Sequence, residues 1–158
     1  MRFLILMTGS FNTYFFMFLA LLTGVAMSTQ AVVNSKLAVY VESPVLAGFI
    51  SFVVGTAALF VYILVSGTPL GNLAGAKYAP PITWIGGFLG AFFVLVMATI
   101  VPRIGLALSF SLAIAGQMLI ALAMDHFGFL GIPERGISWP RLLGVLLIAV
   151  GIVLIRRF

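Results

Sequence analysis

The hydrophobic run from Leu106 to Asp125 is the feature that most restricts what this chain can fold into. At a rise of about 1.5 Å per residue it spans about 30 Å as a helix, which matches the hydrocarbon core of a bilayer. The rest of the run is largely Leu, Ile, Phe and Met, which lipid tolerates. Small and polar residues recur at every fourth position: Ser109, Ala113, Gln117, Ala121 and Asp125. We therefore expect a membrane helix with a polar stripe that faces protein or a watery cavity.

Gln117 is the most informative member of this stripe, because it lies within about 2 Å of the midpoint of the run at the same rise. Its amide carries donors and acceptors that hydrocarbon cannot satisfy. One interpretation is a solute-binding residue. The other is a structural hydrogen bond between helices, typically worth about 0.6 kcal/mol and at most about 1.7 kcal/mol. Both interpretations stay open at this point.

The composition supports a membrane protein and excludes several other classes. The chain of 158 residues is 63% hydrophobic and 7% charged, whereas soluble domains usually carry about 25% charged residues. The net charge of +5 does not predict a nucleic acid partner, because the basic residues stand scattered between apolar runs. With no cysteine, one histidine and three acidic residues, a disulfide framework is ruled out, and little remains for a metal or hydrolytic site. We expect no enzyme, no metal site and no cofactor.

Proline, glycine and polar residues divide the sequence into five predicted membrane spans, at residues 14–40, 44–66, 82–101, 106–125 and 140–155. Ser43 is the expected N-cap of the second span, and Pro44 its first helical residue. We expect residues 1–13 to form an interfacial extension and residues 14–157 a five-helix membrane domain. The fold class is therefore an all-α integral membrane protein, with its termini on opposite sides of the membrane.

Two further patterns concern the faces of these spans. Met27, Gln30 and Asn34 lie at helical spacing on one face of the first span. Small residues mark surfaces where backbones can approach closely: Gly48, Ser51 and Gly55 in the second span, and the G-x-x-x-G spacing of Gly86 and Gly90 in the third.

Lys and Arg residues are evenly divided between the two sides of this topology. One side carries Arg2, Lys77, Arg135 and Arg141, and the other carries Lys36, Arg103, Arg156 and Arg157. Orientation normally follows the imbalance of these residues across the membrane. Without an imbalance, we expect the chain to insert in both orientations, so that two opposed copies pair as an inverted dimer. The alternative is a weak bias, with Lys36 or Arg141 assigned to the wrong side.

Several motifs agree with those of one known family. They are Gly24–Gln30 and Asn34–Leu37 in the first span, Ser51, Phe52 and Gly55 in the second, Trp84–Ala91 in the third, Pro102–Gly105 in the turn that follows, and Ala115–Gln117 and Asp125–Gly131 in and after the fourth. Across about residues 17–156, the sequence resembles the YdcZ-like proteins, half-size members of the drug/metabolite transporter superfamily. The resemblance implies a multi-pass protein of the bacterial inner (plasma) membrane, with five helices that form half of a ten-helix fold. It also implies an antiparallel homodimer, and it assigns no substrate.

We expect a secondary transporter of a small organic solute that works by alternating access as an antiparallel, dual-topology homodimer. The alternatives are a small channel and a non-transporting membrane scaffold subunit. A channel needs a continuous polar path, whereas the polar groups here are concentrated in one band. The expected partners are a second copy of the chain, the lipid bilayer and the solute, without nucleic acid.

The solute site is expected near the midplane, with residues from both copies: Gln30, Asn34, Gln117, Met27, Ser109 and Ala113. No carboxylate lies near the middle of a predicted span, so a neutral or weakly charged polar solute is favoured. Asp125 and Glu42 are candidates for ion coupling. Both lie near a predicted interface, where an acid can simply meet headgroups and water.

The charge balance predicts the orientation of the C-terminus. Reporters that are active on one side of the membrane, fused to the C-terminus, should give signals on both sides for the unmodified chain. Variants in which the Lys/Arg difference is moved by about two charges should give a signal on one side only. A signal from the unmodified chain on a single side would contradict dual orientation.

Overall fold

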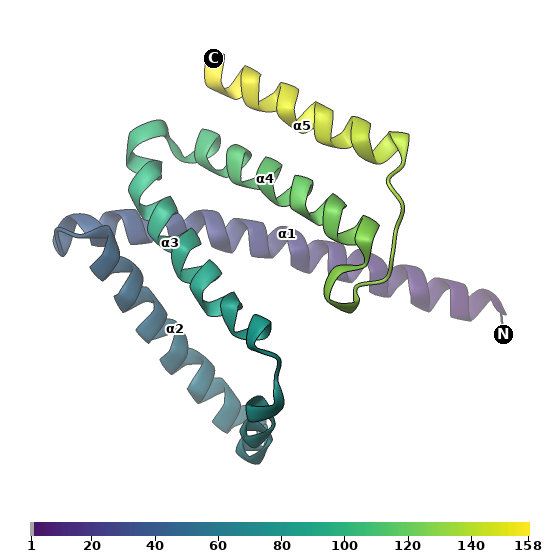
Figure 1. Cartoon of the computed structure of the whole chain (residues 1–158), viewed down its shortest axis with the longest axis horizontal. Helices are drawn as coiled ribbons and strands as arrows, with labels where there is room; N and C mark the ends of the chain where they lie inside the picture. Colours follow the sequence, from purple (N-terminus) through teal and green to yellow (C-terminus); the bar gives the residue numbers. More distant parts are fainter. Residues whose placement is uncertain (1) are drawn as a thin grey trace. The chain divides into compact units, whose positions relative to one another are not determined.

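The computed structural model describes the backbone of residues 2–158 and the side chains of residues 13–158. Its regular structure is helical throughout this part of the chain (Figure 1). The elements are α1 (Arg2–Tyr40), α2 (Pro44–Ser66), η1 (Leu70–Tyr78), η2 (Pro81–Trp84), α3 (Ile85–Ile104), α4 (Leu106–Phe127), η3 (Phe129–Gly131) and α5 (Trp139–Arg157). The predicted interfacial extension covers residues 1–13. The side chains of its residues 1–12 lie outside the described part of the chain.

Five helical segments of the described chain are long and apolar enough to cross a membrane. They are Thr13–Tyr40, Pro44–Ser66, Pro81–Ile104, Leu106–Phe127 and Trp139–Arg157. The chain buries at most 17% of the most apolar stretch in any of them, so lipid or another protein must cover the remaining apolar surface. These segments confirm the predicted class, an all-α integral membrane protein with five spanning helices.

The connection between α1 and α2 is a tight turn with the predicted cap. Oγ of Ser43 accepts a hydrogen bond from the backbone N–H of Leu46 at 3.3 Å, and Pro44 begins the helix. The cap satisfies one of the donors that a helix leaves free in its first turn. Glu42 adopts a φ of 53° in this turn, in the left-handed region that few residues other than glycine occupy.

The end of α3 differs from the sequence prediction. The prediction ends this span at residue 101, because Pro102–Gly105 is interpreted as a tight turn into the fourth span. The helix nevertheless continues to Ile104 with Pro102 inside it. The residue between α3 and α4 is Gly105, whose φ of 84° favours glycine and redirects the chain.

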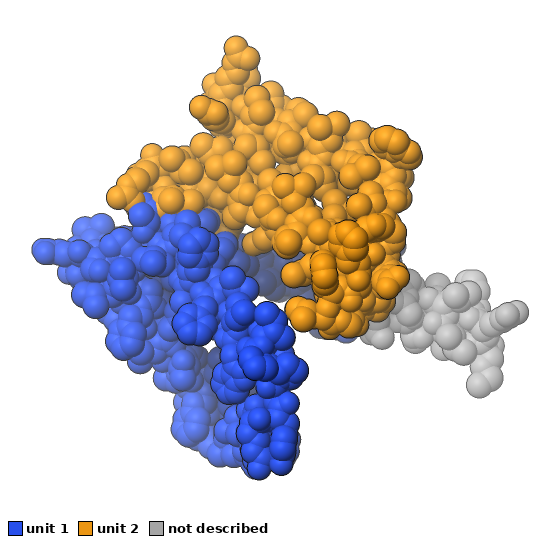
Figure 2. All heavy atoms as spheres, in the orientation of Figure 1, with its two compact units in different colours: residues 1–99 blue, residues 100–158 orange. Residues whose placement is uncertain are grey.

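Two compact units make up the chain, residues 1–99 and residues 100–158 (Figure 2). In the first unit α1 contacts α2. The buried apolar residues there are small or flexible: Ala31, Ala47, Val94, Met97 and Ala98. The hydroxyl of Ser35 lies 2.8 Å from the carbonyl oxygen of Ala31 and 3.4 Å from that of Ala98, which ties α1 to α3. In the second unit α4 packs along α5.

The predicted glycine surfaces of α2 and α3 meet each other only in part. A Cβ at Gly48 would lie 3.7 Å from Cγ1 of Val94, and one at Gly90 would lie 3.5 Å from Cζ of Phe52. A Cβ at Gly55 or Gly86 would have no such neighbour within 4 Å. Gly48 and Gly90 therefore serve contacts inside one copy of the chain, whereas Gly55 and Gly86 leave open surface.

Substitutions in α3 distinguish these two kinds of glycine. Gly90→Leu should destabilise the chain by about 1–3 kcal/mol, because the added side chain must displace the ring of Phe52. Gly90→Ala should be tolerated, since its Cβ makes an ordinary van der Waals contact. Gly86→Leu is the matched control on the same helix and should change the stability little. Thermal unfolding of the monomer in detergent measures all three, and equal losses for the two Leu variants would contradict the assignment.

Candidate functional site

The amide of Asn34 is the most constrained polar group of α1. The residue is 4% exposed, and Nδ2 of its side chain has no hydrogen-bond partner among the side chains and backbone that the structure describes. A buried donor without a partner costs about 1–3 kcal/mol. Asn34 therefore calls for an acceptor that the single chain does not supply.

Several hydroxyl groups of the membrane helices behave differently, because they find an acceptor one turn back along the chain. The hydroxyls of Thr29, Ser35, Thr99 and Ser109 donate to the carbonyl oxygens of Val25, Ala31, Leu95 and Gly105, at 2.9, 2.8, 2.8 and 2.6 Å. This back-bonding is typical of Ser and Thr in helices. Nδ2 of Asn34, in contrast, is a buried donor that still needs a partner.

The other predicted site residues of α1 surround Asn34 unevenly. Met27 is half-buried, and Gln30 is exposed. Ala31 and Ser35, which neighbour Asn34 on the helix surface, are buried. The predicted face of α1 therefore does not have a uniform environment. Gln30 is exposed, and Asn34, one helical turn later, is buried.

The predicted stripe of α4 winds around the helix instead of forming a single face. A step of four residues turns about 40° past a full circle, so the positions from Ser109 to Asp125 cover about 160°. Ser109 is 1% exposed, Ala113 is half-buried and Gln117 is exposed. Ala121 lines a groove beside α5. The members of the stripe therefore have different environments, and Gln117 lies uncovered on the single chain.

The carboxylate of Asp125 forms an ion pair with Nη2 of Arg141 in the first turn of α5. Nη1 of the same guanidinium donates to the carbonyl oxygens of Arg135 and Gly136 at 3.2 and 3.4 Å. The backbone N–H of Arg135 donates to the carbonyl oxygen of Asp125 at 2.7 Å. Asp125 and Arg141 thus fasten the end of α4, the loop and the start of α5 together. This partner of Asp125 is not predicted from the sequence. The signal for it is an acid in the last turns of one helix and a base in the first turn of the next.

The predicted site residues fall into two sets that belong to different units. Met27, Gln30 and Asn34 lie on α1, whereas Ser109, Ala113 and Gln117 lie on α4. Glu42, the other candidate for ion coupling, is exposed in the turn between α1 and α2. Within the described residues, no group of acidic, histidine or cysteine side chains is placed to hold a metal ion.

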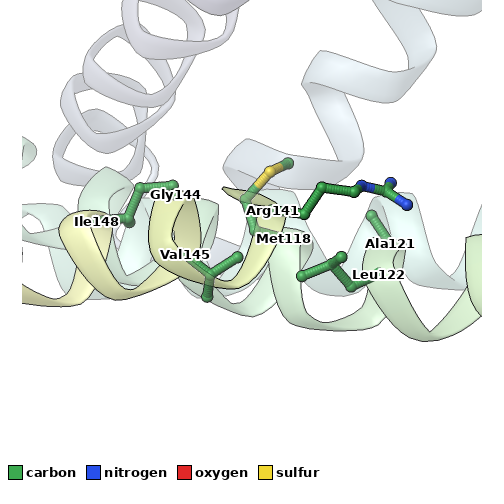
Figure 3. A pocket seen from close by; sticks show the side chains of 7 residues that line it. All are labelled: Met118, Ala121, Leu122, Arg141, Gly144, Val145 and Ile148. Atoms are coloured by element: carbon green, nitrogen blue, oxygen red, sulfur yellow. The ribbon is translucent and has the colours of Figure 1, made fainter. Parts of the chain in front are cut away.

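Among the grooves of the described residues, one in each unit has a volume of about 280 Å³. One lies between α2 and α3 and is lined by Val45, Gly48, Phe49, Phe52, Ala91 and Leu95. The other lies between α4 and α5, with Arg141 among apolar neighbours (Figure 3). Neither groove is lined by Gln30, Asn34 or Gln117. The sequence analysis did not identify either groove, since each depends on how two helices diverge.

Comparisons with known proteins agree with the five-span architecture. The family described as "Putative inner membrane exporter, YdcZ" matches residues 15–154. Inner membrane protein YdcZ of Escherichia coli (strain K12) is 33% identical over 75 residues, which are 48% of this chain and 50% of that protein. The aligned part thus spans about half the length of this relative. No solved structure matches the chain.

A double-mutant cycle tests the role of the ion pair between α4 and α5. The side chains of Asp125 and Arg141 are 27% and 34% exposed, so solvent screening limits the coupling energy to about 1 kcal/mol. Asp125→Asn and Arg141→Gln should each lower the free energy of unfolding, and the double variant should lose less than the sum of the two. Chemical denaturation in detergent measures these energies. Strictly additive losses would show that the two side chains do not interact.

Proposed function

The chain belongs to the YdcZ family of inner membrane proteins, and on this premise we propose that it exports a small polar organic solute as an antiparallel homodimer. It is a multi-pass protein of the inner membrane. The family's description supports export, and the unpaired amide of Asn34 is the observation that carries the proposed solute site.

The proposed role of Asn34 is to donate a hydrogen bond from Nδ2 to an acceptor oxygen of the solute. The cost of leaving this donor unpaired would be recovered when the solute binds. Because the site is built around a polar group, an analogue that lacks the acceptor would be rejected strongly. On the same helix, Gln30 would add a further donor and acceptor, and Met27 an apolar contact. Gln117, Ser109 and Ala113 are the candidates that α4 of the second unit would contribute.

The charges of the chain favour an uncharged solute. Its three acidic residues are Glu42, Asp125 and Glu134, and none of them lies in the middle of a spanning helix. Asp125 is already paired with Arg141. A cation at the midplane would therefore lack a counter-charge, which is expensive in hydrocarbon. If transport is coupled to an ion, Asp125 or Glu42 would take part.

The homodimer is proposed because two amides of the single chain would otherwise meet lipid. Gln30 and Gln117 are exposed on spanning helices, and hydrocarbon offers them neither donors nor acceptors. A second copy in the opposite orientation would cover them and place equivalent helices around a site at the midplane, as in transporters with inverted repeats. The equal division of Lys and Arg supports both orientations.

The satisfied hydroxyls argue against the channel alternative. A pore needs polar groups along its whole length, with free donors or acceptors for the permeating species. The hydroxyls of Thr29, Ser35, Thr99 and Ser109 donate within the chain, so they offer a permeating species no donor and only their acceptor lone pairs. A scaffold subunit remains the second candidate. In that case a fixed protein group would be the partner of Asn34.

Asn34→Leu separates solute binding from a structural role. Without solute, this variant should be as stable as the parent or more stable, because the substitution removes an unpaired buried donor and keeps a similar volume. A thermal-shift screen of the purified parent against a library of neutral polar metabolites should identify stabilising compounds. Those compounds should lose their effect on Asn34→Leu.

Thr29→Val is the matched control, because it removes a polar group of α1 that is already satisfied within the helix. It should keep the response to every compound found. A folded Asn34→Leu protein that still responds to each compound would remove Asn34 from the site. A large loss of stability or of assembly in Asn34→Leu would favour the scaffold alternative. Export is then tested by measuring whether cells that produce the parent, and not Asn34→Leu, accumulate the compound in the medium.

A further inference from the structure

We propose that the groove between α4 and α5 binds one chain of a zwitterionic phospholipid, whose phosphate contacts Arg141 at the mouth of the groove. This site is separate from the proposed solute site and does not depend on it. The groove lies entirely within the second unit and is lined by Met118, Ala121, Leu122, Arg141, Gly144, Val145 and Ile148 (Figure 3).

The shape and size of the groove suit an acyl chain. Apart from Arg141, its lining is apolar, and Ala121 and Gly144 provide the space between the two helices. Its volume of about 280 Å³ is just below the range of about 300–1,000 Å³ that is typical of pockets for drug-sized molecules. A single flexible hydrocarbon chain fits such a space better than a bulky solute.

The position of the groove along α5 matches one leaflet of the bilayer. Its α5 residues extend from Arg141 to Ile148, which is about 10 Å along the helix axis. Half of the hydrocarbon core is about 15 Å thick, so the groove runs from the headgroup level toward the midplane without crossing it. Trp139, which is 85% exposed, marks the interface at the same end of α5.

The charged groups at the mouth match a headgroup that carries both signs. Nη2 of Arg141 pairs with Asp125, and the backbone of Arg135 is bound to the backbone of Asp125. Glu134, beside Arg135, packs within 3 Å of where a Cβ on Gly128 would lie. The guanidinium of Arg141 and the carboxylate of Asp125 thus form a neutral pair at this end, and the carboxylate of Glu134 belongs to the loop that joins the two helices.

Arg141 is the residue through which the phosphate would be held. Its side chain is 34% exposed, and its guanidinium extends along α4 past Ala121 (Figure 3). A guanidinium has five N–H donors in a planar fork, so it can contact a phosphate while it keeps its bonds to Asp125 and the loop. An ammonium in the same headgroup would find the carboxylates of Asp125 and Glu134, whereas an anionic headgroup would meet them unfavourably.

Native mass spectrometry of the delipidated, purified chain tests the proposal. The chain is titrated with phosphatidylethanolamine or phosphatidylglycerol of identical acyl chains, and the affinity of the first bound lipid is measured. We expect phosphatidylethanolamine to bind more tightly. Gly144→Leu should weaken this binding about tenfold or more, because the new side chain occupies the groove. Gly151→Leu is the matched control: it lies on the same helix, has equally open space at its Cβ position and does not line the groove.

Arg141→Gln should also weaken the binding of phosphatidylethanolamine about tenfold, since a charged hydrogen bond to the phosphate is lost. If this variant fails to fold because Asp125 loses its partner, the two glycine variants still decide the question. Equal affinities for Gly144→Leu and Gly151→Leu would overturn the site. Tighter binding of phosphatidylglycerol than of phosphatidylethanolamine by the parent would overturn the assignment of a zwitterionic headgroup.

Discussion

Hydrocarbon cannot form hydrogen bonds, so each polar group in a spanning helix must find its partner within protein or in a bound molecule. In this chain several hydroxyls solve the problem locally, as Ser109 does by donating to the carbonyl oxygen of Gly105. Nδ2 of Asn34 is buried without a partner among the described side chains, and the amides of Gln30 and Gln117 are exposed. The proposed solute and the proposed second copy both follow from this difference between hydroxyls and amides.

Packing within the chain leaves much of the helix surface free to contact a solute or a second copy. The buried apolar residues of the first unit are few, and a Cβ added at Gly48 or Gly90 would meet Val94 or Phe52 of the neighbouring helix at an ordinary van der Waals distance. In the second unit, the pairing of Asp125 with Arg141 closes the connection between α4 and α5. Most of the surface of the five spanning segments remains uncovered by the chain itself. Lipid and a second copy of the chain can cover this surface. We propose that lipid occupies the α4–α5 groove.

The sequence was sufficient to predict the elements whose causes are local. The lengths of the hydrophobic runs predict the five spans, and Ser43 followed by Pro44 predicts the start of α2. Features that depend on neighbouring elements were not predictable in the same way. The loop after α4 must fold back before Arg141 can reach Asp125, and periodicity cannot tell that α1 buries Asn34 while it exposes Gln30. The end of α3 was missed because Pro102 disfavours a helix without excluding it from the last turn.

Cross-linking between two copies through α4 tests the central claim, that an oppositely oriented copy covers Gln117. The chain has no cysteine, so Ala113→Cys and Ala121→Cys each introduce a single thiol, about 12 Å apart along the helix and on either side of Gln117. Two differently tagged copies, one with each substitution, are produced together in membranes and treated with a bismaleimide shorter than that separation. The account predicts that residue 113 of one copy is joined to residue 121 of the other. Products that join only like positions would indicate parallel copies and would contradict the antiparallel dimer, and the absence of any product would contradict the covering of Gln117.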